Sequence, residues 1–119
     1  METTKLLEDF PKVTIVIKQW FLDKLLESLK DDSVPENFKE FVRAQDMEND
    51  KIATMIEANP RVLFDVFDAH KVYIEISIDD LNGFWWRIDE NKSTVGYEYR
   101  INAEKAAIEQ AFQILNDKL

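Results

Sequence analysis

The spacing of hydrophobic positions changes from a helical period to a period of two near residue 72. Apolar residues occupy every second position over residues 72–78 and again over residues 84–88. Such alternation is typical of strands with one buried face, and Asn82-Gly83 between the two runs is a turn signal. A third run, over about residues 94–101, would place Val95, Tyr97, Tyr99 and Ile101 on one face. The pattern predicts a three-stranded antiparallel meander.

Helical spacing returns at the C-terminus. There, apolar residues recur three or four positions apart, at Ala107, Ile108, Ala111, Phe112 and Leu115. This spacing predicts a helix with one apolar face, and we expect that face to pack on the sheet. Asn102 is the expected N-cap, and Glu104 would lie favourably in the first turn.

A long helix is predicted over residues 12–30, because apolar positions follow helical spacing throughout. Two apolar stripes start nine residues apart, which places them on roughly opposite faces of one helix. The helix is therefore either buried on two sides or broken near Phe21. Residues 13–17 are rich in β-branched side chains, so a short strand is an alternative for this part.

Three shorter helices are predicted between this helix and the first strand. The first begins with a capping box formed by Ser33 and Glu36, the second is capped by Asn49, and the third begins at Pro60 with Asn59 as its cap. The second contains the apolar residues Ile52, Met55 and Ile56, and the third has Leu63, Val66 and Phe67 facing inward. We therefore predict an α+β fold in a single domain over residues 1–119, with a helical N-terminal half.

The amino-acid composition excludes or disfavours several classes of protein function. The chain has 24 acidic and 15 basic residues, a net charge of -9 and no cysteine. This charge argues against direct nucleic-acid binding, and the lack of cysteine excludes disulfides, thiolate metal sites and a catalytic thiol. No apolar run approaches the roughly 18 residues that a membrane span needs, and no signal-peptide pattern is present. We expect a cytoplasmic location and no membrane association.

Catalytic and metal-binding patterns are weak. His70 is the only histidine, and its place before a strand favours a structural role at the end of a helix. There is no glycine-rich phosphate loop and no nucleophile elbow. Carboxylates at the expected strand ends match no calcium loop and are more often solvated turn residues; they are Asp79, Asp80, Asp89 and Glu90. Asp46, Glu48 and Asp50 are interpreted as helix-capping and first-turn charges. We predict no catalytic, cofactor-binding or metal-binding residue.

One candidate binding face follows from the alternation in the second strand. Phe84, Trp86 and Ile88 should point to the core, whereas Trp85 and Arg87 point to the other side. Tyr73, Glu75 and Arg100, together with Gly96, are expected to share that second face. Such a face could bind a partner, but layer packing favours the alternative that the N-terminal helices cover it.

The leading functional hypothesis is a non-enzymatic protein that binds another macromolecule. The acidic charge would speed association with a protein that has a basic surface, as expected of an inhibitor, an immunity protein or a phage accessory protein. One alternative is a small-molecule-binding domain or minor enzyme that uses the face around Trp85. Another is a self-associating subunit that forms a homodimer through a strand edge or the aromatic face.

Overall fold

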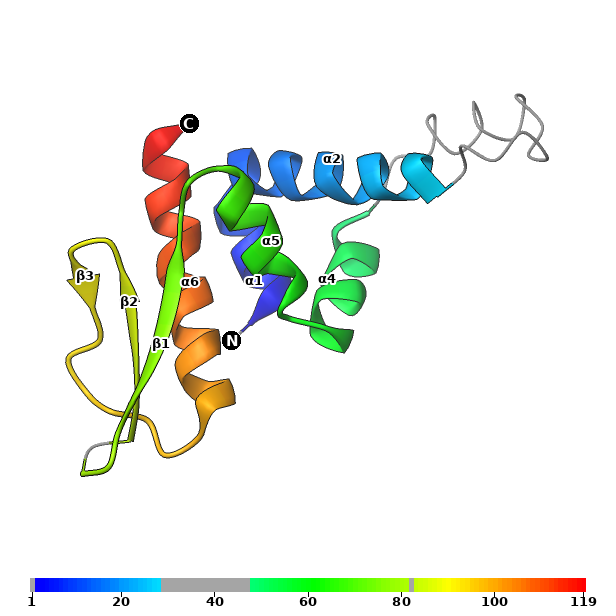
Figure 1. Cartoon of the computed structure of the whole chain (residues 1–119). Coiled ribbons are helices and arrows are strands. Elements are labelled where there is room, and N and C mark those ends of the chain that lie inside the picture. The colour runs from blue at the N-terminus through cyan, green and yellow to red at the C-terminus, as the bar shows by residue number, and fades with distance from the viewer. Residues whose placement is uncertain (1, 29–47, 82) are drawn as a thin grey trace, which may run out of the picture.

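The computed structural model describes residues 2–28, 48–81 and 83–119, and within them it shows an α+β architecture, as predicted (Figure 1). The helices are α1 (Thr3–Asp9), α2 (Pro11–Ser28), α4 (Asn49–Ala58), α5 (Val62–Ala69) and α6 (Arg100–Lys118). The strands are β1 (Ile74–Asp79), β2 (Gly83–Ile88) and β3 (Asn91–Lys92). The helix predicted from the capping box at Ser33 falls outside the described residues.

The sheet is antiparallel in the order β1-β2-β3, with pairs running from Ile74 opposite Ile88 to Asp79 opposite Gly83. Gly83 opens β2 with φ of 87°, a left-handed conformation that side chains disfavour. A Cβ atom at this position would lie 2.4 Å from the backbone oxygen of Tyr97. Glycine is therefore required both by the backbone conformation and by the close approach of the segment before α6.

The position predicted for the third strand is wrong. β3 contains two residues, after which the Oγ atom of Ser93 accepts a hydrogen bond from the backbone N–H of Trp86 at 3.2 Å. A side-chain oxygen thus takes the place of a backbone acceptor, and the regular ladder ends there. Tyr97 forms one isolated bridge to Phe84, and Arg100 already begins α6. The expected common face of Val95, Tyr97, Tyr99 and Ile101 is consequently not formed.

Helix α6 packs on one face of the sheet, which confirms the prediction for the C-terminal segment. All five residues of its predicted apolar stripe are buried. Alanine at two of these positions lets the helix approach the sheet closely, and Ile76, Trp86 and Ile88 pack against it from the strands. The predicted cap is wrong, because Tyr99 is the N-cap and Asn102 lies exposed within the first turn.

The N-terminal helices gather beside α5 and α6 (Figure 1). α1, which the sequence pattern did not predict, packs against α2 and α4, while α2 also contacts α5 and α6. α2 is continuous, so neither the break near Phe21 nor the strand over residues 13–17 occurs. Its first stripe is buried through Val13 and Ile17, whereas Leu25 of the second stripe is exposed.

Helices α4 and α5 are confirmed, with their starts shifted by one or two residues. Glu48 is the N-cap of α4 and Asn49 its first residue, and Asn59 ends the helix with a non-helical backbone before Pro60. α5 begins at Val62 because Pro60 and Arg61 first form a turn, in which the carbonyl of Asn59 accepts a hydrogen bond from the N–H of Val62. Leu63, Val66 and Phe67 are buried, as predicted, and so are Ile52 and Ile56, whereas Met55 is exposed.

Candidate functional site

The face of the sheet opposite α6 carries the side chains that the sequence singled out. We call it the open face and define it by Tyr73, Glu75, Ser77, Trp85 and Arg87. The register places Glu75 opposite Arg87 and Ser77 opposite Trp85, which brings the aromatic and charged groups together. Tyr73, which directly precedes β1, is 53% exposed, and Glu75, Ser77 and Arg87 are exposed as well. The expectation that N-terminal helices cover this face is wrong for the helices that the structure describes, because these pack beside α5 and α6.

Trp85 is half-buried in the open face. Its indole Nε1 atom is buried and has no hydrogen-bond partner among the described residues. A buried donor without an acceptor costs free energy, which a tightly packed core position would rarely tolerate. The half-buried ring thus keeps its Nε1 atom away from solvent and leaves part of its apolar area available for contact.

Arg87 separates two hollows on the open face. One has a volume of about 430 Å³ and is lined in part by Ser77, Trp85 and Lys92. The other, of about 360 Å³, is lined by Tyr73, Glu75, Arg87 and Asp89. The Nε atom of Arg87 donates a hydrogen bond to the backbone oxygen of Asp89 at 2.9 Å, which restrains the guanidinium between the hollows. Tryptophan, tyrosine and arginine are the residue types enriched at the energetic centres of protein interfaces.

Arg100 does not belong to this face. Its guanidinium lies over the ring of Phe84, 5.2 Å from the ring centroid, and Phe84 alternates with Trp85 onto the side where α6 packs. Arg100 was placed with Trp85 because it was assigned to a third strand, and it begins a helix instead. The structure thus brings together four of the five predicted binding residues, and Gly96 lies in the irregular segment before α6.

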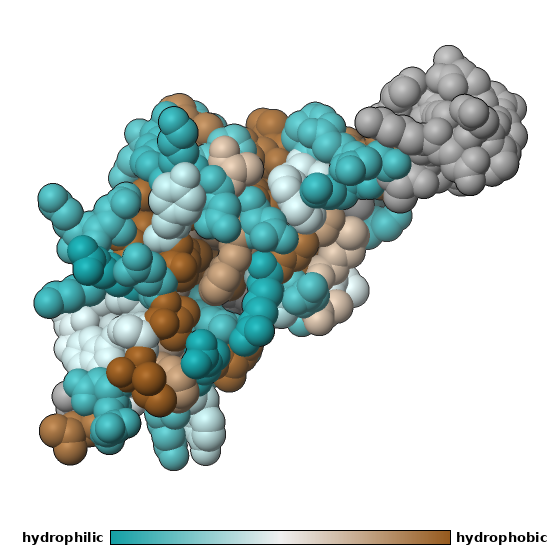
Figure 2. Space-filling model, viewed as in Figure 1, coloured by the Kyte–Doolittle hydropathy of each residue, from teal (hydrophilic) through white to brown (hydrophobic). Residues whose placement is uncertain are grey.

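A group of exposed apolar side chains lies where the β1–β2 turn meets the start of α6. Ile78 is 65% exposed and Leu81 is 92% exposed, and with Val95, Tyr99 and Ile101 they form what we call the apolar end. The Phe84–Tyr97 bridge joins the segments that carry them. Figure 2 shows hydrophobic surface at this end of the molecule. The sequence pattern places Ile78, Val95, Tyr99 and Ile101 in predicted strands and does not predict this exposed group; the apolar Leu81 in a turn is the one signal that points to it.

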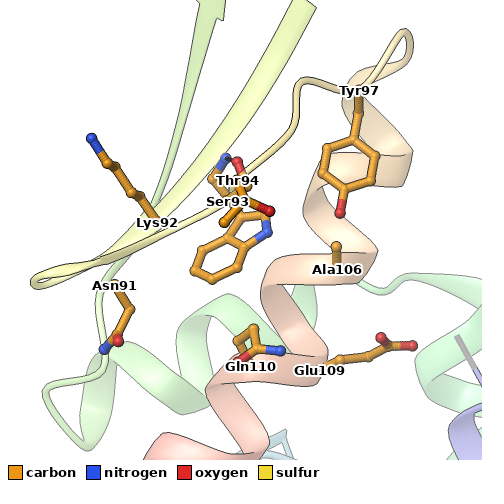
Figure 3. Close-up of a pocket in the computed structure, with 9 residues that line it drawn as sticks. Asn91, Lys92, Ser93, Thr94, Tyr97, Ala106, Glu109 and Gln110 are labelled. Atoms are coloured by element: carbon orange, nitrogen blue, oxygen red, sulfur yellow. Dashed lines mark hydrogen bonds between the residues drawn. The ribbon is translucent and has the colours of Figure 1, made fainter.

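A further pocket lies between α6 and the segment that follows β2 (Figure 3). It has a volume of about 430 Å³, with Trp86 and Tyr97 among its lining residues. Figure 3 shows Glu109 and Gln110 of α6 on one side and Asn91 and Ser93 on the other. These amide, hydroxyl and carboxylate groups suit hydrogen bonding to a small polar molecule. The sequence pattern did not predict this pocket, because its lining combines residues of α6 with the irregular segment after β3.

The described residues contain no group of three or more His, Asp or Glu side chains placed to hold a metal ion. His70 is the C-cap residue of α5, as its sequence position predicts. Asp50 lies in the first turn of α4, as expected, whereas Asp46 is outside the described residues. In the parts of the chain that are described, the helices are too short or too polar to cross a membrane.

No family model matches the chain, and no curated protein or solved structure shows significant similarity to it.

Proposed function

We propose that the protein acts without catalysis, by binding a protein partner that has a basic surface. The open face and the adjoining apolar end form the docking surface, and the cytoplasm is the expected location. An inhibitor or immunity protein, or a phage accessory protein, works in this way. The single observation that carries the proposal is the position of Trp85 and Arg87 on a sheet face over which no described helix packs.

The chemistry of this surface supports a macromolecular partner. Trp85 and Tyr73 offer apolar area at a small cost in side-chain entropy, and Arg87 offers planar hydrogen-bond donors. Glu75 and Asp89 beside Arg87 offer acceptors for lysine or arginine side chains of the partner. The net charge of -9 would steer a basic partner toward the molecule, so association should weaken as salt rises.

Two charge reversals of equal size test the proposal. Glu75→Lys changes the open face, and Glu57→Lys makes the same change at an exposed position of α4. Immobilised wild type and both variants would be used to capture proteins from a lysate of the source cells at several salt concentrations. We expect one basic protein that wild type and Glu57→Lys retain at low salt and that Glu75→Lys loses.

The two variants have the same net charge, so a difference between them reports the site rather than overall electrostatics. Circular dichroism would first confirm that both are folded. Equal retention by both variants would exclude the open face as the docking surface, and equal loss would reduce the interaction to non-specific charge attraction. The absence of any salt-sensitive partner of wild type would reject the proposal as a whole.

The hollow beside Trp85 also favours the alternative of small-molecule binding. Its test is a thermal-shift screen of small anionic and aromatic compounds against wild type and Trp85→Phe. A compound that stabilises wild type and not the variant would support the alternative. If no compound stabilises wild type, the alternative is rejected for these classes of compound.

A further inference from the structure

The outer edge of β1 presents unpaired backbone groups. The N–H and C=O of Phe84 both bond to Tyr97, and the backbone of Trp86 bonds to Ser93, so these residues of β2 point away from β1. Backbone groups alternate in direction along a strand. The backbone groups of the other residues of β2 therefore point toward β1, where Gly83 bonds to Asp79, Trp85 to Ser77 and Arg87 to Glu75. The N–H and C=O groups of Ile74, Ile76 and Ile78 consequently point to the outer edge, which pairs with no described strand.

This edge lacks several of the features that usually prevent pairing. The strand sequence IEISID contains no proline and no lysine, and the structure shows no bulge in the β1–β2 pairing. Ile78 exposes most of its side chain at the end of the strand. A second strand laid along the edge would satisfy the outward backbone groups and cover part of this apolar side chain.

We infer that two copies of the chain associate through their β1 edges as an antiparallel pair, with Ile76 opposite Ile76 of the second copy. In such a pair, a residue with outward backbone groups in one copy must lie opposite a residue with outward backbone groups in the other. Only a few registers of the two β1 strands meet this condition. Centring the pair one residue earlier sets Glu75 against Glu75, and centring it one residue later sets Glu75 against Asp79. Only the register centred on Ile76 aligns most of the strand without opposing two carboxylates.

This register also matches the two faces of the sheet. On the side of α6, Ile78 lies beside Ile74 of the second copy, which extends an apolar row across the interface. On the other side, Glu75 lies beside Ser77 of the second copy. The two three-stranded sheets join into one six-stranded sheet, and the two open faces become continuous.

The effect of salt separates this inference from the proposed function. Each copy carries a net charge of -9, so two copies repel each other, and screening by salt should strengthen their association. Binding to a basic partner should instead weaken as salt rises. Either interaction can fail in experiment without the other.

Sedimentation equilibrium of the whole chain, from micromolar concentrations to about 1 mM at low and high salt, tests the inference. We expect the average mass to approach twice the 14.0 kDa of one chain as the concentration rises. The dimer should form at a lower protein concentration at high salt than at low salt. Ile78→Lys should weaken the dimer by about tenfold or more, because it places a charge in the apolar row. Leu81→Lys introduces the same charge in the turn, outside the paired residues, and should leave the dimer unchanged. A mass of one chain under all conditions, or equal effects of both variants, would overturn the inference.

Cysteine cross-linking tests the register, because the chain has no native cysteine. Opposed Cα atoms of a non-hydrogen-bonded pair lie about 4.5 Å apart, within the range for a disulfide. The double variant Glu75→Cys/Ser77→Cys should therefore cross-link rapidly into dimers under oxidising conditions. Each single variant should cross-link about tenfold more slowly, because its cysteines lie about 8 Å apart on the diagonal. Faster cross-linking of either single variant would contradict the register centred on Ile76.

Discussion

The guanidinium of Arg61 forms a two-point ion pair with the carboxylate of Glu104. The Nη2–Oε1 distance is 3.0 Å and the Nε–Oε2 distance is 3.5 Å. Arg61 is the N-cap residue of α5, while Glu104 lies in α6 with a side chain that is only 4% exposed. The pair therefore fixes the start of α5 to the helix that supports the sheet, and it supplies the charge partner that a buried carboxylate requires.

Removing Arg61 should destabilise the fold. Arg61→Ala leaves the buried carboxylate of Glu104 without a cation, and we expect a loss of about 2 kcal/mol in the free energy of unfolding. The arginine itself is largely exposed, so solvent screening keeps this loss below that of a fully buried pair. Urea unfolding of Arg61→Ala, Glu104→Gln and the double variant gives the coupling, expected at about 1 kcal/mol. A coupling near zero would show that the pair contributes nothing to stability.

The same substitution at two buried threonines should have opposite effects. The hydroxyl of Thr14 donates to the backbone oxygens of Leu7 and Phe10, at 2.6 and 3.0 Å, and so joins the start of α2 to the end of α1. The buried hydroxyl of Thr3 has no partner among the described residues. Thr14→Val should lower the free energy of unfolding by about 1–2 kcal/mol, and Thr3→Val should raise it by up to about 1 kcal/mol. If the midpoint temperature of thermal unfolding changes in the same direction in both variants, this account is contradicted.

The two glycines should differ in their tolerance of a side chain. Gly83→Ala introduces a Cβ atom into contact with the Tyr97 backbone and imposes a positive φ on alanine. We expect a loss of about 2 kcal/mol or more in unfolding free energy. Gly96 has no positive φ, so Gly96→Ala should change stability by less than about 1 kcal/mol. Similar losses in the two variants, measured by urea unfolding, would show that the tight approach at Gly83 is not formed.

Ser93, directly after β3, should be more sensitive to replacement by alanine than Ser77 in β1. Its buried Oγ atom accepts the backbone N–H of Trp86, so Ser93→Ala leaves that donor without an acceptor. We expect a loss of about 1–2 kcal/mol, compared with about 0.5 kcal/mol or less for the exposed Ser77→Ala. Amide hydrogen exchange of Trp86 should accelerate in Ser93→Ala alone. Unchanged protection of that amide would contradict the role of Ser93 in ending the ladder.

The elements with strong periodicity could be predicted from sequence, since burial of one face determines their spacing. The β1–β2 hairpin, α5 and the apolar stripe of α6 belong to this class. The third strand could not be placed, because it ends through a side-chain hydrogen bond of Ser93 that leaves no periodic signal. The prediction of Glu104 as a first-turn charge is wrong, because the first turn of α6 contains no acidic residue, and its partner Arg61 is 43 residues away in sequence.

For the candidate site as well, predictions from the local sequence pattern are correct, and predictions that depend on contacts between distant segments are not. Alternation alone placed Tyr73, Glu75, Trp85 and Arg87 on one face, and the register of β1 and β2 confirms it. The prediction that Arg100 lies on this face is wrong because it depended on the misplaced third strand. Whether helices cover the face depends on how α1, α2 and α4 pack, and their apolar stripes do not specify which surface they contact.

Hydroxyl-radical footprinting of the chain, free and bound to its captured partner, tests the docking of that partner on the open face most directly. The account predicts that oxidation of Tyr73 and Trp85 falls on binding, while oxidation of Trp20 on α2 stays unchanged. Unchanged oxidation of Tyr73 and Trp85, together with protection of Trp20, would place the interface on the N-terminal helices and contradict the account.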